Sequence, residues 1–271
     1  MKGFFAALLV GIAGCAWAAT EELVTIPARG GATLSYLLIQ DKPGTAKAVA
    51  ISFVGGSGAI DLVKRSQNGS AKFGPTANFL VRVRDQLVDA DVADVIVDSP
   101  SDKLPQGMDD DFRLGADHLA DIKALTADIR KRFPNAKIYL VGTSRGTISA
   151  AALGAKLGDS VQGVVLTSTV TNRSKAGEGL SRFDYSTIKV PLLFVHHRDD
   201  GCAVSPYGNV ERLSQSYPLI SVSGGDPPQT GPCDPLAPHG YFGREASVVQ
   251  AMKNWMLGRE FAREIPVTTA P

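Results

Sequence analysis

The chain has 271 residues, of which 44% are hydrophobic and 20% charged, and its formal net charge is +1. So small a charge gives no basic surplus for nucleic acid or an anionic membrane surface, and we expect neither as a partner. The length suits a single α/β domain with one core.

Residues 1–18 have the pattern of a secretory signal peptide. Lys2 gives a positive start, residues 4–12 are apolar but too few to span a bilayer, and residues 16–18 read Ala-Trp-Ala. We therefore expect cleavage after Ala18 and export to the periplasm or the medium. Alternatively, the segment Ile12-Ala13-Gly14-Cys15 resembles a bacterial lipoprotein box, in which case Cys15 would carry a lipid anchor.

The rest of the chain alternates between apolar strand-like segments and segments of helical spacing. We expect strands at 23–26, 33–39, 48–54, 93–97, 137–141, 161–167, 191–197 and 219–222, and helices at 78–89, 114–133, 146–157, 208–216 and 244–257. This alternation predicts an α/β fold with a mostly parallel sheet covered by helices on both faces. No linker or repeat interrupts it, so we expect one domain over 19–258 and a frayed tail over 259–271.

The segment Gly142-Thr143-Ser144-Arg145-Gly146 lies between an apolar strand and a small-residue helix. A serine at such a strand–turn–helix junction is exposed on a strained backbone, and the flanking glycines avoid collisions between the strand and the helix. The helix N-terminus directs N–H groups toward an oxyanion formed there. The segment therefore predicts Ser144 as a nucleophile. The alternative is a glycine-rich turn of a non-catalytic α/β protein.

A serine nucleophile needs a histidine base, which is oriented by a carboxylate. Of the histidines after Ser144, only His239 has an acidic loop before it and lies in a loop that precedes the last helix. We expect His239 to be the base. The strand at 191–197 leads into Asp199 and Asp200, and we prefer Asp200 as the acid because the loop needs a few residues to leave the strand. Asp199 is the alternative.

Two backbone N–H groups are expected to bind the oxyanion. One belongs to Arg145, the residue after the nucleophile, and the other to a glycine of the loop at 53–58. We choose Gly56 for the second donor, with Ser57 as the alternative. The Arg145 side chain could either meet an anionic substrate or pair with a nearby aspartate.

No metal site is expected in this chain. Adjacent residues on a strand point to opposite faces, so His196 and His197 cannot readily share a metal ion. The three acids Asp109-Asp110-Asp111 lack the alternating spacing of a calcium loop and predict a solvated turn. His118, in the helix before the turn, is expected at the edge of the core.

Two cysteines remain after the leader, Cys202 and Cys233. An even count in an exported chain predicts a disulfide between them, and two free buried thiols are the alternative. Because Cys202 follows Asp200 and Cys233 precedes His239, the bridge would tie together the loops of the acid and the base.

These residues together resemble the α/β-hydrolase superfamily over nearly the whole mature length. The features in common are the turn at 142–146, the glycine loop at 55–58, Asp200 after its strand, and His239 before a terminal helix containing Trp255. The stretch from His196 to Cys202, with Pro232-Cys233 and residues 238–241, further resembles an exported bacterial subgroup of general hydrolases.

The resemblance implies hydrolysis of an ester or related acyl bond in a small-molecule or acyl-ester substrate, without a cofactor. A peptidase or amidase of the same fold, or a non-catalytic binding protein, are the alternatives. Many members carry His-Gly where this chain has Val54-Gly55, so the second oxyanion donor departs from the family pattern. The irregular stretches at 98–113 and 168–189 are too short and polar for a large lid.

Overall fold

The computed structural model describes residues 19–67 and 78–267. The predicted signal peptide and the alternative lipid anchor at Cys15 fall on residues 1–18, outside the described part. Among the described residues, no helix is long and apolar enough to cross a membrane.

The described part contains one nine-stranded sheet in the order β1-β2-β4-β3-β5-β6-β7-β8-β9. β1 pairs with β2, and β2 with β4, in antiparallel fashion, whereas every other pair is parallel. The strands are β1 Thr20–Pro27, β2 Thr33–Gln40, β3 Ala48–Phe53, β4 Val92–Val97, β5 Lys137–Thr143, β6 Gly163–Thr167, β7 Leu192–His197, β8 Leu219–Val222 and β9 Glu264–Ile265. The predicted mostly parallel α/β sheet is therefore present.

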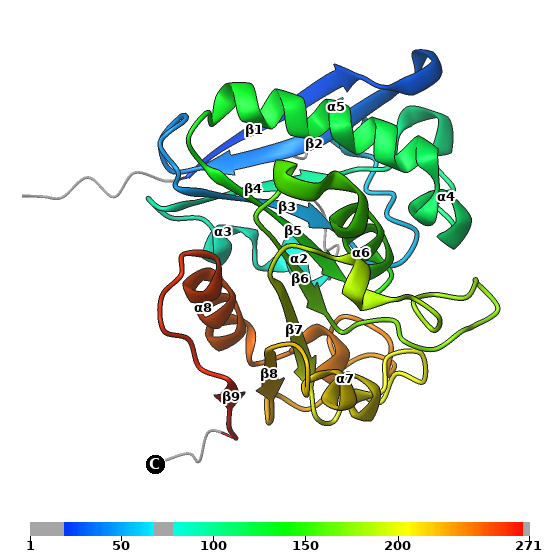
Figure 1. Ribbon diagram of the computed structural model, residues 1–271, viewed down its shortest axis with the longest axis vertical. Helices are drawn as coiled ribbons and strands as arrows, with labels where there is room; N and C mark the ends of the chain where they lie inside the picture. Colours follow the sequence, from blue (N-terminus) through cyan, green and yellow to red (C-terminus); the bar gives the residue numbers. More distant parts are fainter. Residues whose placement is uncertain (1–18, 68–77, 268–271) are drawn as a thin grey trace, which may run out of the picture.

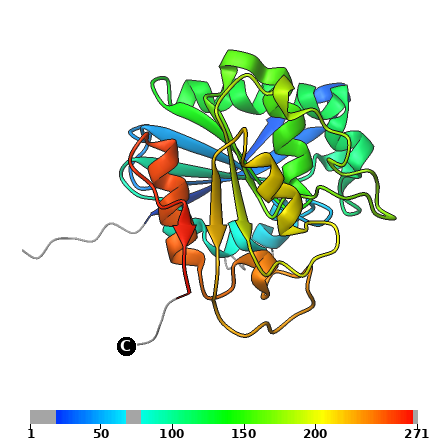
Figure 2. The ribbon, with the colours of Figure 1, turned by 60° about the horizontal axis from the view of Figure 1, so that its bottom comes forward.

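Helices cover both faces of this sheet (Figure 1). They are α1 Leu62–Gln67, α2 Phe79–Arg82, α3 Arg84–Leu87, α4 Asp110–Leu114, α5 Ala116–Arg132, α6 Gly146–Leu157, α7 Tyr207–Leu213 and α8 Glu245–Met256. One apolar core lies between the sheet and α5 and α6, and a second lies between the sheet and α2, α3 and α8. Figure 2 shows α8 and α5 on opposite sides of the strands.

The strands of the sheet interior are buried on both faces, as their apolar sequences predict. In β3, Val49 and Ile51 pack into the core beneath α5 and α6, whereas Ala48 and Ala50 face the core beneath α8. The alternation fixes the register of β3, since a slip by one residue would exchange the two sets.

The structure corrects several sequence predictions. The helix expected at 78–89 is divided into α2 and α3 at Val83. The helix expected at 114–133 begins at Ala116 as α5, because Leu114 ends α4 and the extended backbone of Gly115 separates the two helices. The expected tail at 259–271 contains the short strand β9, which pairs with the edge strand β8. The backbone N–H groups of Ser221 and Ser223 donate to the carbonyl oxygens of Arg263 and Ile265. Helix α1 was not predicted.

The sheet also holds a buried carboxyl group. Asp94 of β4 is fully buried and accepts a hydrogen bond from Ser52 Oγ at 2.6 Å. Burial raises the pKa of Asp94 to about 7, and the bond from Ser52 only partly opposes this rise. The folded protein therefore keeps a proton on Asp94 at pH values where the unfolded chain has released it.

A pH-dependent loss of stability follows from Asp94. Between an unfolded pKa near 4 and the folded pKa, folding takes up a proton, so this residue's contribution to stability declines as pH rises through that window. We expect the melting temperature of Asp94→Asn, relative to that of the wild type, to increase from pH 4.5 to pH 8. Thermal melts at both pH values measure this, with the exposed Asp111→Asn as control. A constant difference would contradict it.

Candidate active site

The turn between β5 and α6 presents Ser144 with a left-handed backbone, φ 73°. The chain bends so tightly here that a Cβ on Gly142 would lie 2.5 Å from the carbonyl oxygen of Gly146. A Cβ on Gly146 would lie 2.0 Å from the carbonyl oxygen of Phe53 in β3. Both glycines are therefore required by close approach, and the strained serine projects from the carboxyl end of β5.

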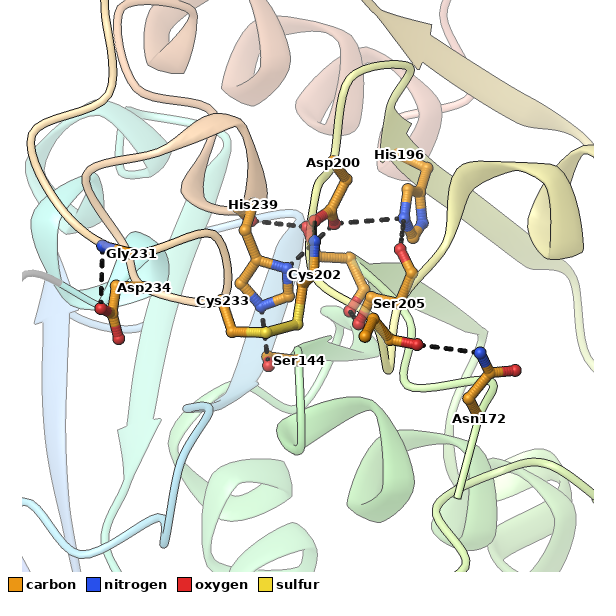
Figure 3. Close-up of a disulfide and its surroundings, with 12 residues drawn as sticks. Ser144, Asn172, His196, Asp200, Cys202, Ser205, Gly231, Cys233, Asp234 and His239 are labelled. Atoms are coloured by element: carbon orange, nitrogen blue, oxygen red, sulfur yellow. Dashed lines mark hydrogen bonds and ion pairs between the residues drawn. A yellow bond between two sulfur atoms is a disulfide. The ribbon is translucent and has the colours of Figure 1, made fainter. Parts of the chain in front are cut away.

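Ser144, His239 and Asp200 form a continuous hydrogen-bonded chain (Figure 3). Ser144 Oγ lies 2.9 Å from His239 Nε2, and His239 Nδ1 lies 2.9 Å from Asp200 Oδ2. An ionised carboxylate only accepts hydrogen bonds, so Nδ1 carries the proton in the neutral ring. The lone pair of Nε2 then faces the serine hydroxyl, which is the geometry required of a general base.

Asp200 is buried and its carboxylate is fully engaged. Oδ1 accepts the Cys202 backbone N–H at 2.9 Å, while Oδ2 faces His239 and, at 3.3 Å, His196 Nε2. Burial alone would raise the pKa of Asp200, but hydrogen bonds from His196 and His239 outweigh it and hold the pKa below its ordinary value. Asp200 therefore stays ionised at neutral pH. Asp199, the alternative acid, is exposed.

His196 is a contact that the sequence did not predict. Its Nε2 lies 2.8 Å from the carbonyl oxygen of Ser205, so this nitrogen carries a proton and points between Ser205 and Asp200. Its neighbour His197 turns the other way and bonds to the carbonyl oxygen of Gly224 at 2.7 Å. The alternation of β7 thus directs one histidine to the carboxylate and the other away from it.

The loop of His239 is fastened to the ends of β6 and β7. Ser168 Oγ donates to the His239 carbonyl oxygen at 2.6 Å, and Tyr241 Oη donates to the Val195 carbonyl oxygen at 2.7 Å. The Tyr241 hydroxyl also accepts the Ser168 backbone N–H at 2.9 Å. Ser168 and Tyr241 therefore fix the position of the imidazole. The only sequence signal for this role was the proximity of Tyr241 to His239.

A cavity of about 220 Å³ opens beside Ser144. Gly55 and Gly56 form one wall, and Cys233 and Asp234 contribute another. Among the described residues, the backbone N–H groups of Gly56 and Arg145 donate no hydrogen bond. Both predicted donors are thus unengaged within the described part of the chain, and Gly56 adopts the positive φ of 62° that favours glycine.

The side chain of Arg145 turns away to an aspartate. Its Nη2 lies 2.6 Å from Asp110 Oδ1, and Asp110 Oδ2 accepts the Gly179 backbone N–H at 3.0 Å. Of the two alternatives for Arg145, the structure shows the pairing with an aspartate. The prediction of a solvated turn at 109–111 was wrong, because Asp110 is buried and Asp109 caps α4 by accepting the Phe112 N–H.

His118 is also more deeply placed than predicted. It lies in the core instead of at its edge, between the rings of Phe53 and Phe112. Burial, together with the charge of the neighbouring Arg113, lowers its pKa to about 3. His118 is therefore a neutral packing residue at physiological pH.

A disulfide joins Cys202 to Cys233 and links the loop of Asp200 to the loop that precedes His239. Figure 3 shows the bridge beside the imidazole of His239. Cys202 is buried, whereas Cys233 lines the cavity at Ser144. The bridge therefore both ties the two loops together and forms part of the cavity wall.

Reduction of this disulfide is expected to lower catalytic rate before it unfolds the domain. The bridged cysteines are 31 residues apart, which corresponds to about 3–4 kcal/mol of stability in the chain-entropy model. Far-ultraviolet circular dichroism near room temperature should be unchanged, while the melting temperature falls. Peptide mapping must verify reduction. Full activity in verified reduced protein would show that the bridge is not needed to align His239 with Asp200.

Within the described residues, no group of three or more His, Cys, Asp or Glu side chains is arranged to hold a metal ion.

A family model described as "Serine aminopeptidase, S33" matches residues 106–183, which include the turn of Ser144. The fold is also similar to that of an α/β serine hydrolase without a lid from Xanthomonas campestris. The two are 14% identical, the match covers 93% of this chain and 97% of that one, and the TM-score is 0.58. The chain therefore has the fold of α/β serine hydrolases, and its residues 106–183 match a serine hydrolase family model.

Other solved structures agree with this assignment of fold. Est1E from Butyrivibrio proteoclasticus is 17% identical over 87% of this chain and 98% of its own chain, with a TM-score of 0.55. A dienelactone hydrolase from Anabaena variabilis is 16% identical over 89% and 99% of the two chains, with a TM-score of 0.57. No curated protein matches the sequence.

The described part of the chain has no separate lid. The connections after β4 and β6 contain only short 3-10 turns before α4 and β7. The expectation of a fold without a large lid is therefore confirmed.

Proposed function

We propose that the protein is an exported carboxylic ester hydrolase in which Ser144, His239 and Asp200 act as a catalytic triad. The observation that carries this proposal is the hydrogen-bonded chain from Ser144 Oγ through the imidazole to the Asp200 carboxylate. The order of the three residues in sequence is also that of α/β-hydrolases.

The proposed reaction has two halves. Ser144 Oγ attacks the substrate carbonyl carbon while His239 Nε2 takes the hydroxyl proton, and the Gly56 and Arg145 N–H groups bind the resulting oxyanion. His239 then returns the proton to the leaving alcohol, and an acyl-enzyme remains on Ser144. Water, deprotonated by His239, attacks this ester, and the acid leaves as the serine hydroxyl is restored. Asp200 stabilises the imidazolium in both halves.

An ester is the favoured substrate, and an amide is the second candidate. A cavity of about 220 Å³ suits a small acyl or alkyl group, and a solved structure with this fold is described as a cold-adapted esterase. The family model, in contrast, carries the name of an aminopeptidase. Rates on matched short- and long-chain acyl esters, acyl anilides and aminoacyl anilides test this choice. Hydrolysis of the anilides alone would overturn the assignment to esters.

A fluorophosphonate probe tests the nucleophile directly, because it bonds covalently only to an activated serine. We expect labelling of Ser144, identified by peptide mapping, and loss of esterase activity in proportion to the label. An unlabelled, correctly folded protein would favour the non-catalytic binding protein instead.

Export is supported by the leader-like residues 1–18 and by the disulfide, since such bonds persist in oxidising compartments. Mass spectrometry of the exported protein is expected to find Ala19 at the N-terminus. A diacylglyceryl group on Cys15 would establish the lipoprotein alternative, and an intact leader in active protein would contradict both.

A further inference from the structure

Arg113 of α4 is a fully buried arginine, with 1% of its surface exposed. It lies between the loop of Gly56 and the helix that follows Ser144. Its Nη2 donates to the Gly56 carbonyl oxygen at 3.2 Å, and its Nη1 donates to Ser149 Oγ of α6 at 2.9 Å. One guanidinium group therefore bridges the two segments that supply the oxyanion donors.

No carboxylate pairs with this guanidinium group within the described part of the chain. The nearest acids are already committed, since Asp110 binds Arg145 and the Gly179 N–H, and Asp109 caps α4. Burial, together with the charge of Arg145, lowers the pKa of Arg113 to about 9, and the group still carries its charge at neutral pH. Holding an unpaired cation in the interior costs stability, so its position calls for a compensating role.

In the loop of Gly56, each carbonyl oxygen from Gly55 to Ser57 accepts a hydrogen bond from a different donor. The Gly55 oxygen accepts the Gly58 N–H at 3.2 Å, and the Ser57 oxygen accepts the Met108 N–H at 2.8 Å. Beyond them, Asp98 accepts the backbone N–H groups of Ile60, Asp61 and Leu62. Of the three described carbonyl groups of Gly55, Gly56 and Ser57, only that of Gly56 is held by a side-chain cation.

A trans peptide places its N–H opposite its carbonyl oxygen. The contact with Arg113 therefore fixes the plane of the Gly56–Ser57 peptide and holds Gly56 in its left-handed conformation. A cation at the Gly56 carbonyl oxygen also polarises this peptide, which makes the N–H of Ser57, the alternative oxyanion donor, a stronger donor. The charge itself adds positive potential at the wall where a substrate oxyanion would form.

We propose that Arg113 is a positioning residue of the oxyanion site, which orients the Gly56 loop and supplies it with positive charge. This proposal rests on the proposed function of Ser144. It assigns the charge to stabilising the transition state, so its loss should lower kcat and leave KM nearly unchanged.

The test compares variants that differ in charge. Arg113→Met removes the cation and keeps an apolar side chain that can fill the space, whereas Arg113→Lys keeps the charge. We expect kcat to fall roughly 10- to 100-fold in Arg113→Met and less in Arg113→Lys, with KM within about threefold of the wild type. Affinity for a boronic acid that mimics the tetrahedral intermediate should fall in parallel with kcat. Arg182→Met, which removes the charge of an exposed arginine away from Ser144, is the matched control and should leave kcat unchanged.

A purely structural role predicts a different pattern, in which kcat follows the melting temperature across the variants. Unchanged kcat in folded Arg113→Met, or loss of kcat only in proportion to unfolding, would overturn the proposal. If Arg113→Met does not fold, Arg113→Lys and Arg113→Gln decide, because equal kcat in the two would exclude a role for charge. Fluorophosphonate labelling of Ser144 in the wild type distinguishes a wrong role for Arg113 from a wrong proposed function. If only the role of Arg113 is wrong, Ser144 is still labelled; if the proposed function is wrong, it is not labelled.

Discussion

Replacing Ser144 with alanine is expected to lower ester hydrolysis by about 10³-fold or more, since the members of a catalytic triad act as a unit. The fold should remain intact. Alanine is built on the same left-handed backbone and only the hydroxyl group in contact with His239 is lost. Steady-state rates and thermal melts of the purified variant measure both effects.

The matched control is Ser216→Ala, which removes an exposed hydroxyl group after α7. It should have the activity and melting temperature of the wild type. Substantial hydrolysis by a Ser144→Ala preparation free of wild-type enzyme would remove the central claim, because no acyl-enzyme could then form on Ser144.

The second large effect is expected from Asp200→Asn. An asparagine cannot stabilise the imidazolium, and its amide can favour the wrong tautomer of His239, so kcat should fall about 10³- to 10⁴-fold. Asp200 also accepts the Cys202 N–H and faces His196, so a loss of stability is expected as well. Activity must therefore be measured well below the melting temperature of the variant.

Asp199→Asn provides the comparison, since the two aspartates are adjacent in sequence but only Asp200 meets the imidazole. Asp199 is exposed, so its variant should retain nearly all activity. An inactive Asp199→Asn enzyme beside an active Asp200→Asn enzyme would reverse the assignment of the acid.

Much of the sheet could be predicted from the sequence because its interior strands are continuous apolar segments bounded by turn residues. The turn of Ser144 could also be predicted from the sequence, because Gly142 and Gly146 lie at the two positions where the backbone of the turn comes too close to its neighbours for a side chain. The break at Val83 was not predicted, because local helical spacing does not reveal how a segment must bend over the sheet. β9 was missed because a two-residue strand shows no periodicity in the sequence. It forms because its backbone pairs with the edge strand β8.

In the candidate site, only the residues that a serine-hydrolase mechanism itself requires could be predicted from the sequence. Ser144, Asp200 and His239 follow from the order of a nucleophile, an acid and a base along the chain. Arg113, His196 and Ser168 do not, because their roles arise from long-range contacts with backbone carbonyls and a carboxylate. Asp110 was misjudged for the same reason, as its partner Arg145 is distant in sequence.

The parallel sheet has a consequence for how fast this enzyme gains activity during folding. Ser144, Asp200 and His239 follow β5, β7 and β8, and neighbouring parallel strands can pair only after a long crossover segment is closed. Helices α5 and α6 depend far more on local contacts. In refolding with the disulfide intact, helical circular dichroism should therefore return first. Ester hydrolysis should return last, as a late reporter of native topology.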